Sequence, residues 1–329
     1  MAPEISVIIP LFNEAPNVPE LYKELTTVLE GLGRAYELIL IDDGSTDNTY
    51  QLLADIRGVD SRVIVIQFRR NFGQTAGFAA GFDHARGETI VTSDGDLQND
   101  PGDIPTMLSK LEEGYDIVCG WRRDRKDPWL KRRVPSTLAN WLISVTTGVH
   151  LHDYGCSLKV FRAEIIKGLR LYGEMHRFIP AIASQQGVRI AELVVNHRAR
   201  RFGLSKYGLS RIIRVVFDLV TVKFLLSFST RPLQMFGPPG LVIGLVGLGI
   251  LISLGYVRLF EGQPIGDRPL LLLAILMLFT GIQLVTIGLL AELQARTYHE
   301  SQGKPIYVVR HLLDGSSPTP ETQAPVANV

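Results

Sequence analysis

Two long stretches without a charged residue constrain this chain more than any other feature of its sequence. They cover residues 232–257 and 269–291. A helix rises about 1.5 Å per residue, so either stretch can cross a hydrocarbon core of roughly 30 Å. Buried helices of a globular core rarely run so far without a charged face. We therefore predict two transmembrane helices, at about 233–257 and 269–291, that form a hairpin within 232–292.

The basic residues around these stretches predict how the hairpin is oriented. Lys223 and Arg231 precede it, three further basic residues follow it between 296 and 310, and the connection over 258–268 holds only two. Cytoplasmic flanks of membrane spans are enriched in Lys and Arg. The chain is therefore expected to be an integral membrane protein with both of its ends in the cytoplasm.

Composition also predicts the character of the segments on either side of the hairpin. Between Arg198 and Arg231 there are eight basic residues and one acid, interleaved with apolar side chains. Residues 209–231 are expected to lie along the lipid headgroups as a juxtamembrane amphipathic helix, and a solvated basic face is the alternative. The tail at 293–329 is expected in the cytoplasm, and its end, rich in Pro, Ser and Thr, is expected to be disordered.

Residues 1–208 show a different pattern, in which short apolar runs alternate with helical stretches. Such alternation is typical of an α/β domain with a parallel sheet. Helices are expected over 17–31 and 46–56, the second of them capped by Ser45 or Thr46. The strands, which are rich in Val, Ile and Leu, are expected at 5–9, 38–41, 63–68, 89–92 and 117–119.

Composition excludes several classes of function. The net charge of +1 provides no general attraction for nucleic acid, so no nucleic-acid partner is expected. The two cysteines, Cys119 and Cys156, lack the spacing of a zinc site and are expected to be buried thiols. No GxGxxG fingerprint follows the first strand, and no GxxxxGK phosphate loop occurs in the chain. A bound nucleotide would have to be held in another way.

Polar side chains follow three of the predicted strands at their carboxyl ends. These three segments are 13–14, 42–47 and 94–98. Ligands of open α/β sheets bind at this edge. The side-chain oxygens of Asp94, Asp96 and Gln98 would suit a hard divalent cation that neutralises a diphosphate. Acid pairs in turns more often cap helices or face water, so it is the position at a strand end that favours the metal site.

A strongly basic stretch follows the fifth predicted strand. Residues 122–133 hold seven basic residues and two acids. Guanidinium groups form paired hydrogen bonds with phosphate oxygens. We interpret the stretch as a loop that binds a phosphate, because a phosphate carried on a lipid would arrive at the headgroup layer, beside the membrane spans. A solvated basic surface is the alternative.

Together these segments resemble the inverting glycosyltransferases of family 2. The resemblance is strongest to the polyprenyl-phosphate glycosyltransferases, such as dolichyl-phosphate mannose synthase and the bacterial undecaprenyl-phosphate glucosyltransferases. It covers roughly residues 5–207, extends to the two-span hairpin, and implies a GT-A (Rossmann-like) nucleotide-sugar domain and a bacterial inner-membrane location. The matching segments are 6–10, 13–14, 41–47, 69–73, 94–98, 173–178 and 200–207.

The resemblance implies roles for individual residues. Asp96 would act in catalysis through the metal, and Asp153 would orient the attacking phosphate, with an ion pair to Lys159 or an arginine as the equal alternative for Asp153. His176 would shape the acceptor side. The nucleotide sugar would be bound by Pro10, Glu14, Asp42, Asp43 and Asp94. A Mg²⁺ or Mn²⁺ ion would be bound by Asp94, Asp96 and Gln98. The acceptor phosphate would be bound by Arg122, Arg132, Ser136, Arg200 and Lys206.

The implied reaction is a displacement at the anomeric carbon by a phosphate oxygen of the lipid, with inversion. The expected partners are UDP-glucose, undecaprenyl phosphate, the membrane and a second copy of the chain. Within the family, the alternative donors are GDP-mannose, UDP-N-acetylglucosamine or another UDP-sugar, and the alternative acceptor is dolichyl phosphate. Outside it, the alternatives are a lipid-translocating or scaffolding protein with a nucleotide-sensing domain and a nucleotidyltransferase. Spans without charge do not favour translocation, and a nucleotidyltransferase does not explain the hairpin.

Overall fold

A computed structural model gives the arrangement of most of the chain. The chain divides into two units, one made of Met1–Asp218 and Pro305–Val329 and the other of Leu219–Lys304. The predicted amphipathic helix at 209–231 and the predicted boundary at 208 lie outside the described residues. The structure describes residues 2–123, 143–144, 147–169, 171, 175–199, 233–301 and 306–314.

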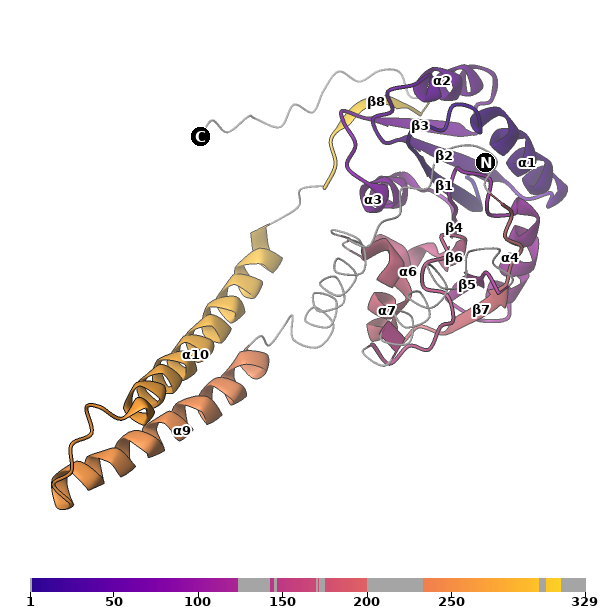
Figure 1. Ribbon diagram of the computed structural model, residues 1–329. Helices are drawn as coiled ribbons and strands as arrows, with labels where there is room; N and C mark the ends of the chain where they lie inside the picture. Colours follow the sequence, from indigo (N-terminus) through magenta and orange to yellow (C-terminus); the bar gives the residue numbers. More distant parts are fainter. Residues whose placement is uncertain are drawn as a thin grey trace. The chain divides into compact units, whose positions relative to one another are not determined.

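The described part of the first unit is built on an eight-stranded sheet with the order β7-β5-β6-β4-β1-β2-β3-β8 (Figure 1). All five predicted strands are present, and β4, β1, β2 and β3 run parallel at its centre. The strands are β1 Ile5–Leu11, β2 Tyr36–Asp42, β3 Val63–Phe68, β4 Thr89–Thr92, β5 Ile117–Trp121, β6 Lys159–Arg162, β7 Ile190–Val194 and β8 Val309–Leu313.

One strand that was not predicted, β6, brings its first residue to the edge where the parallel strands end. It runs antiparallel between β4 and β5, with Lys159 opposite both Thr92 and Cys119. Because β6 runs in the opposite direction, its beginning lies beside the carboxyl end of β4. Side chains from β6 can therefore join those that follow β1, β2 and β4.

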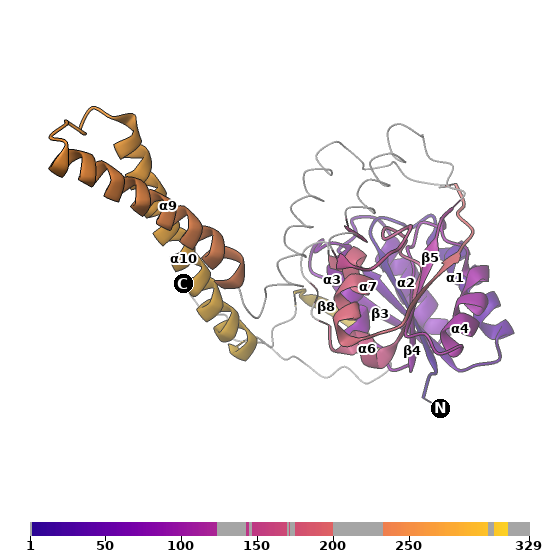
Figure 2. The same cartoon turned by 90° about the horizontal axis from the view of Figure 1, so that it is seen from below.

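Helices cover both faces of the sheet, with α1 and α4 on one face and α3, α6 and α7 on the other (Figure 2). The second predicted helix begins at Thr49, and the predicted caps Ser45 and Thr46 are wrong, because the side chain of Asp47 accepts the Thr49 N–H at 3.0 Å. The helices are α1 Val18–Gly31, α2 Thr49–Val59, α3 Gln74–His84, η1 Pro101–Asp103, α4 Ile104–Glu112, α6 Ala163–Lys167, η3 Met175–Phe178, α7 Ile179–Ala183 and η4 Ser184–Gln186.

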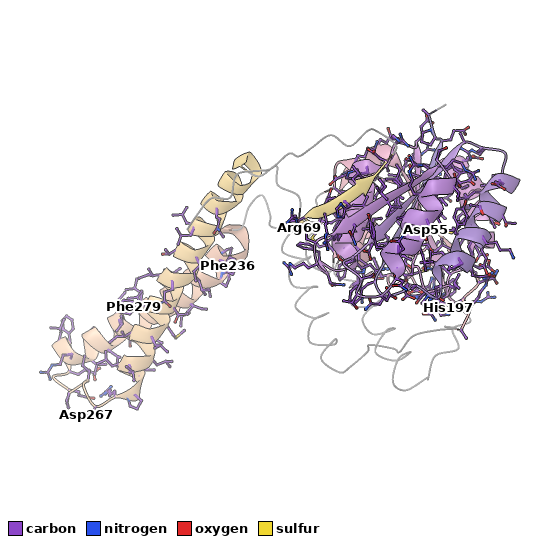
Figure 3. The ribbon with its side chains drawn as sticks, turned by 90° about the horizontal axis from the view of Figure 1, so that it is seen from above. Asp55, Arg69, His197, Phe236, Asp267 and Phe279 are labelled. Atoms are coloured by element: carbon purple, nitrogen blue, oxygen red, sulfur yellow. The ribbon has the colours of Figure 1, made fainter. Side chains whose placement is uncertain are left out.

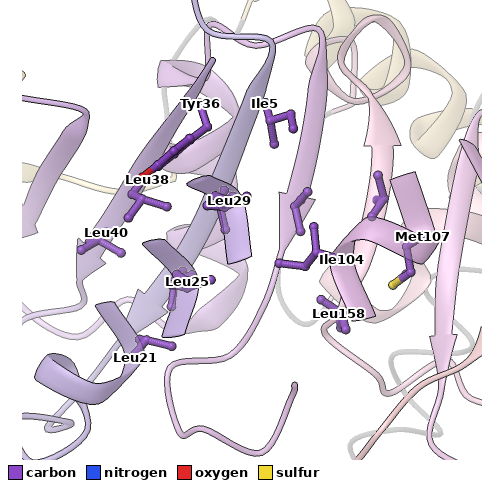
Figure 4. Packing of buried hydrophobic residues seen from close by; sticks show 14 of the residues in the cluster. Ile5, Leu21, Leu25, Leu29, Tyr36, Leu38, Leu40, Ile104, Met107 and Leu158 are labelled. Carbon is purple, nitrogen blue, oxygen red and sulfur yellow. The ribbon is translucent and has the colours of Figure 1, made fainter. Parts of the chain in front are cut away.

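The main core lies between the sheet and the α1 and α4 face (Figure 4). Helix α1 presents Leu21, Leu25 and Leu29, four residues apart, to alternate residues of the strands such as Ile5 and Leu38. Each buried leucine of this kind contributes about 1.5–3 kcal/mol of apolar burial. This packing fixes α1 and the loop that precedes it against the end of β1.

On the opposite face, α3 packs closely against β1. A Cβ atom added at Gly81 would overlap the side chain of Ile8, and one added at Gly77 would lie 2.7 Å from Pro10 Cβ. Only glycine allows this approach. The start of α3, with Gln74 and Thr75, is thereby held beside the carboxyl end of β1.

The segment after the hairpin returns to the sheet as β8, which pairs antiparallel with β3. The Tyr307 ring stacks on Phe68, with ring centroids 5.2 Å apart, and its hydroxyl donates to Asp83 at 2.8 Å. The predicted tail at 293–329 thus contains an ordered strand. Its predicted disordered end, 315–329, lies outside the described residues.

The second unit contains two long helices, α9 Leu233–Phe260 and α10 Pro269–Ser301, which form the predicted hairpin. Their span-like parts are Phe236–Phe260 and Pro269–Ala291, and only 17% and 11% of the residues are buried in an apolar 18-residue stretch of each. Phe279, shown in Figure 3, is 62% exposed. Helices in a soluble core are mostly buried, whereas these two expose most of their apolar side chains, and by length and composition they could cross a membrane.

Close approach of glycines holds the hairpin together. A Cβ atom added at Gly281 would lie 2.5 Å from Gly240 O and 2.6 Å from Gly244 Cα. The two backbones therefore touch at this crossing, as small residues allow in helix pairs of membrane proteins.

Candidate functional site

A cavity of about 540 Å³ opens at the edge where β1, β2 and β4 end and β6 begins. Most of the predicted site residues that the structure describes line it. The lining includes Pro10, Asn13, Glu14, Asp43, Gln74, Phe78, Thr92, Asp94, Asp96, Gln98, Arg122, Tyr154, Cys156, Lys159, Phe161, His176, Arg177 and Ile179.

Hydrogen bonds between the loops that follow β1 and β2 shape one end of the cavity. Asn13 adopts a left-handed conformation, with φ of 56°, which asparagine tolerates better than most residues. Its N–H donates to Ser45 Oγ at 2.9 Å, and its Oδ1 accepts from Thr46 N at 2.8 Å. Beside it, Glu14 accepts from Asn17 Nδ2. The two loops form one rigid wall.

Two acids follow β2, and the structure gives them different positions. Asp43 lines the cavity, is 4% exposed, and accepts from the N–H groups of Phe72 and Gly73 at 2.7 and 2.9 Å. Burial raises its pKa to about 6, although these two hydrogen bonds act in the opposite direction. Asp42 lies behind the described lining, where it accepts from Ser45 N and Gln67 Nε2, both at 3.1 Å. Asp42 therefore stabilises the turn that follows β2.

The acidic turn 94–98 follows β4 at the middle of the cavity. Gln74 donates to Asp94 Oδ1, and Asp96 Oδ1 accepts from Gln98 N at 3.2 Å. The pKa of Asp94 is raised by burial and by the charge of Asp96. Leu97 has a φ of 60°. This conformation strains a non-glycine residue and lets the turn reverse tightly.

The donor set of this turn fits a hard divalent cation that is completed by ligand oxygens. Within the described residues there is no cluster of three or more His, Cys, Asp or Glu side chains that would hold a metal by themselves. Two carboxylates and one amide oxygen, from Asp94, Asp96 and Gln98, are a partial set of the kind that Mg²⁺ shares with phosphate oxygens. A cation would also offset the repulsion between the two carboxylates.

A buried ion pair lies at the wall that follows β5. The guanidinium of Arg122 donates to both oxygens of Asp153, with Nε–Oδ2 at 2.7 Å and Nη2–Oδ1 at 3.0 Å. The two side chains are 10% and 4% exposed. Arg122 lines the cavity, whereas Asp153 lies behind it and also accepts from Gly155 N at 3.1 Å. Asp153 was expected either to orient the attacking phosphate or to form an ion pair with Lys159 or an arginine. This contact favours the ion pair, with Arg122 as the arginine.

Four predicted acceptor residues, Arg132, Ser136, Arg200 and Lys206, lie outside the described residues, so their positions stay predictions. The chain just before Arg200 is described. There the Arg198 N–H donates to Gln98 O at 2.9 Å, which places this segment against the acidic turn.

Comparisons with known proteins identify the family. The model of "Glycosyl transferase family 2" matches residues 6–170. The chain belongs to this family. It is 46% identical over 320 residues to the dodecaprenyl-phosphate galacturonate synthase of Rhizobium johnstonii, covering 95% of this chain and 94% of that one.

Solved structures show the fold of this glycosyltransferase. Its α/β unit resembles glucosyl-3-phosphoglycerate synthase from Mycobacterium tuberculosis, with a TM-score of 0.54 and 20% identity over 69% of this chain and 82% of that chain. That crystal contains Mn²⁺, UDP and glucosyl-3-phosphoglycerate, and another with the same TM-score contains Mn²⁺ and UDP-glucose. The predicted GT-A fold followed by a two-helix hairpin is confirmed.

Sequence reasoning missed several residues of this glycosyltransferase that line the cavity. Gln74, Lys159 and Arg177 were given no role of their own in the cavity, and His176 was placed only through the resemblance. His176 Nδ1 lies 2.7 Å from Thr75 Oγ1, at the start of α3. Lys159 could have been found as a cation at the first position of an antiparallel strand. That position can be recognised only once the order of the strands in the sheet is known.

Proposed function

We propose that the chain transfers a sugar from a nucleotide sugar to a polyprenyl phosphate at a membrane. The observation that carries the proposal is the combination of one cavity, which joins the β1 and β2 loops to an acidic turn, with a hairpin of two apolar helices in the same chain. The relative named for dodecaprenyl-phosphate supports the acceptor class, because the match extends over both units.

The donor would lie along the carboxyl ends of β2, β1 and β4. Pro10, Glu14 and Asp43 would bind the nucleoside, with Asp42 holding the turn behind them. Asp94, Asp96 and Gln98 would hold a Mg²⁺ or Mn²⁺ ion. When bound, such an ion stabilises the charge of a departing diphosphate. The crystals of the mycobacterial enzyme with Mn²⁺ and UDP support this assignment.

The acceptor phosphate would attack the anomeric carbon directly. A new bond forms between a phosphate oxygen and C1, the bond between C1 and the diphosphate oxygen breaks, and the configuration inverts. The second pKa of a phosphate monoester is near 6, so the nucleophile is ionised at neutral pH and needs no strong base. Arg122, aligned by Asp153, would orient it. Arg132, Ser136, Arg200 and Lys206 complete the proposed acceptor site.

The hairpin would anchor the enzyme in the bacterial inner membrane. The segments before and after it, Met1–Asp218 and Pro305–Val329, belong to the same unit. A unit that contains both flanks requires both ends of the hairpin to emerge on one side of the membrane. The basic flanks favour the cytoplasmic side. Association of two copies through the apolar helices remains part of the proposal.

Two donors are the first to be tested. The resemblance implies glucose from UDP-glucose, whereas the relative is named for galacturonate. These sugars differ in chemistry at C6, which carries a hydroxyl in glucose and a carboxylate in a hexuronate. Transfer from GDP-mannose would test whether the donor carries guanosine instead of uridine.

The test is transfer of radiolabelled sugar from each donor to undecaprenyl phosphate by the full chain in nanodiscs. We expect lipid-linked label with a UDP-sugar, and we expect its loss with EDTA. Asp96→Asn should lower transfer more than a hundredfold, because it removes a charged metal ligand. Asp55→Asn on the exposed surface of α2 (Figure 3) should leave transfer unchanged. Transfer that survives both EDTA and Asp96→Asn would refute the metal site, and no lipid-linked product from any donor would refute the function.

A further inference from the structure

The order of the strands gives the cavity two chemically different ends. Strands β2, β1, β4 and β6 are neighbours in the sheet, so their edge residues follow one another across the cavity. Asp43 and Glu14 lie at the β2 and β1 end, the acidic turn at 94–98 lies after β4, and Lys159 begins β6. If a nucleoside lies at the first end and the diphosphate at the turn, the transferred sugar extends toward β6.

Lys159 is a buried cation at this sugar end. Its residue is 3% exposed, and its ammonium donates to the backbone carbonyls of Cys156 and, at 3.4 Å, of Tyr154. No carboxylate of the described residues lies within ion-pair distance of Lys159 Nζ, in contrast to Arg122. A buried charge is costly unless it meets an opposite charge. The cavity that Lys159 lines is the place from which that charge can come.

Arg122, which follows β5, also lines this side of the cavity, and its charge is paired with Asp153. His176 and Arg177, from η3, line the cavity as well, with His176 beside Thr75 at the start of α3, and so do the apolar side chains of Phe78, Phe161 and Ile179. Of the acids that face the cavity, Asp94 of the turn lies near enough for the charge of Lys159 to act on it, in the direction that lowers the pKa of Asp94, but the two groups do not form an ion pair. A neutral hexose would present only hydroxyl groups to the Lys159 ammonium. A sugar with an acidic group would give this ammonium a carboxylate within hydrogen-bond distance.

We propose that Lys159 binds the carboxylate of the transferred sugar and that the donor is a UDP-linked hexuronate. The inference rests on the proposed function, since it assumes a nucleotide sugar in this cavity. Lys159 would then select against neutral hexoses, because binding one of them would leave a buried ammonium without its partner. The pairing of β6 with β4 and β5 keeps Lys159 in place before the donor arrives.

The experiment measures donor binding without acceptor, by calorimetry on the full chain in detergent with Mn²⁺. The ligands are UDP, UDP-galactose and UDP-galacturonate. Wild type should bind UDP-galacturonate at least about tenfold more tightly than UDP-galactose, as expected for a hydrogen bond between charged groups. Lys159→Gln should remove this preference and leave the affinity for UDP unchanged. Lys159→Arg should retain part of it, and Lys167→Gln, on the exposed end of α6, should retain all of it.

Other results would overturn the assignment. An equal loss for UDP and for both UDP-sugars in Lys159→Gln would place the ammonium on the diphosphate or give it a purely structural role. Unchanged donor binding in Lys159→Gln, together with a raised KM for polyprenyl phosphate in the radiolabel transfer assay, would place the ammonium on the acceptor. Wild-type enzyme that binds the two UDP-sugars equally would refute the proposal even if the variants do not fold. Selective binding of UDP-galacturonate without transfer to lipid would instead refute the proposed function and leave the role of Lys159 intact.

Discussion

The α/β unit buries several charged side chains around its cavity, whereas the two span-like helical segments contain no charged residue except Arg258, near the end of α9. Asp43, Lys159 and the pair of Arg122 with Asp153 each depend on specific hydrogen-bond partners. The hairpin depends on shape, through glycines at the crossing of α9 and α10. The two units are thus sensitive to different substitutions, one to loss of a partner and the other to added volume.

This difference follows from the free backbone hydrogen-bonding groups that each unit has for a buried charge. A sheet whose strand ends converge can offer backbone N–H and C=O groups to a buried charge, as Phe72 and Gly73 do for Asp43. Within a helix the backbone groups are already hydrogen-bonded to one another, so they offer nothing further to a buried charge. Packing is then the means of holding two such helices together.

The largest expected effect comes from breaking the buried ion pair. Arg122→Met leaves the Asp153 carboxylate buried without its cation, which should lower the free energy of unfolding by about 3–5 kcal/mol. The double variant Arg122→Met with Asp153→Leu should recover much of that loss, although acceptor use stays low in both. Urea unfolding of the full chain in detergent measures the difference. Arg34→Gln, which breaks solvent-accessible pairs with Glu4 and Glu112, should cost less than about 1 kcal/mol. A double variant no more stable than the single one would contradict the pairing.

A second prediction tests with pH whether burial outweighs hydrogen bonding in setting the pKa of Asp43. Its pKa of about 6 in the folded protein exceeds the ordinary value of 3.8. Folding therefore favours the protonated form, and this stabilisation is complete below pH 3.8 and lost as pH rises through 6. Relative to Asp43→Asn, the free energy of unfolding of wild type should fall by on the order of 3 kcal/mol between pH 3.5 and 7. Asp55→Asn is the exposed control, and a difference that does not vary with pH would contradict the raised pKa.

Local patterns in the sequence were enough to predict much of the fold. The five strands show runs of β-branched and aliphatic residues, and α1 shows its leucines at helical spacing, so each element carries its own signal. The acidic turn was predictable because its residues are adjacent in sequence, as at Asp94 and Asp96. The two apolar helices were predictable because each is encoded by one long run of apolar residues without a charge.

The rest could not be predicted because it depends on pairing between distant segments. Strands β6 and β8 are short, and β8 joins the sheet only after the chain has passed through both apolar helices. Arg122 meets Asp153 31 residues later, and Thr75 meets His176 101 residues later. No local pattern distinguishes Arg122, which has a buried partner, from the other basic residues of its stretch. Lys159 becomes notable only when β6 is known to begin beside the end of β4.

The smallest predicted effect tests the hairpin by adding one methyl group at either of two sites. Gly281→Ala places a Cβ atom about 2.5 Å from Gly240 O, so α9 and α10 must separate, at a cost of about 1–3 kcal/mol. Gly249→Ala makes the same chemical change where nothing lies within 4 Å, and it should be neutral or slightly stabilising because alanine favours the helix. Thermal unfolding in detergent should therefore give a lower midpoint for Gly281→Ala alone, while UDP affinity stays unchanged in both variants. Equal midpoints would mean that shape at the crossing does not hold the hairpin together, and the contrast between the two units would then reduce to their charge.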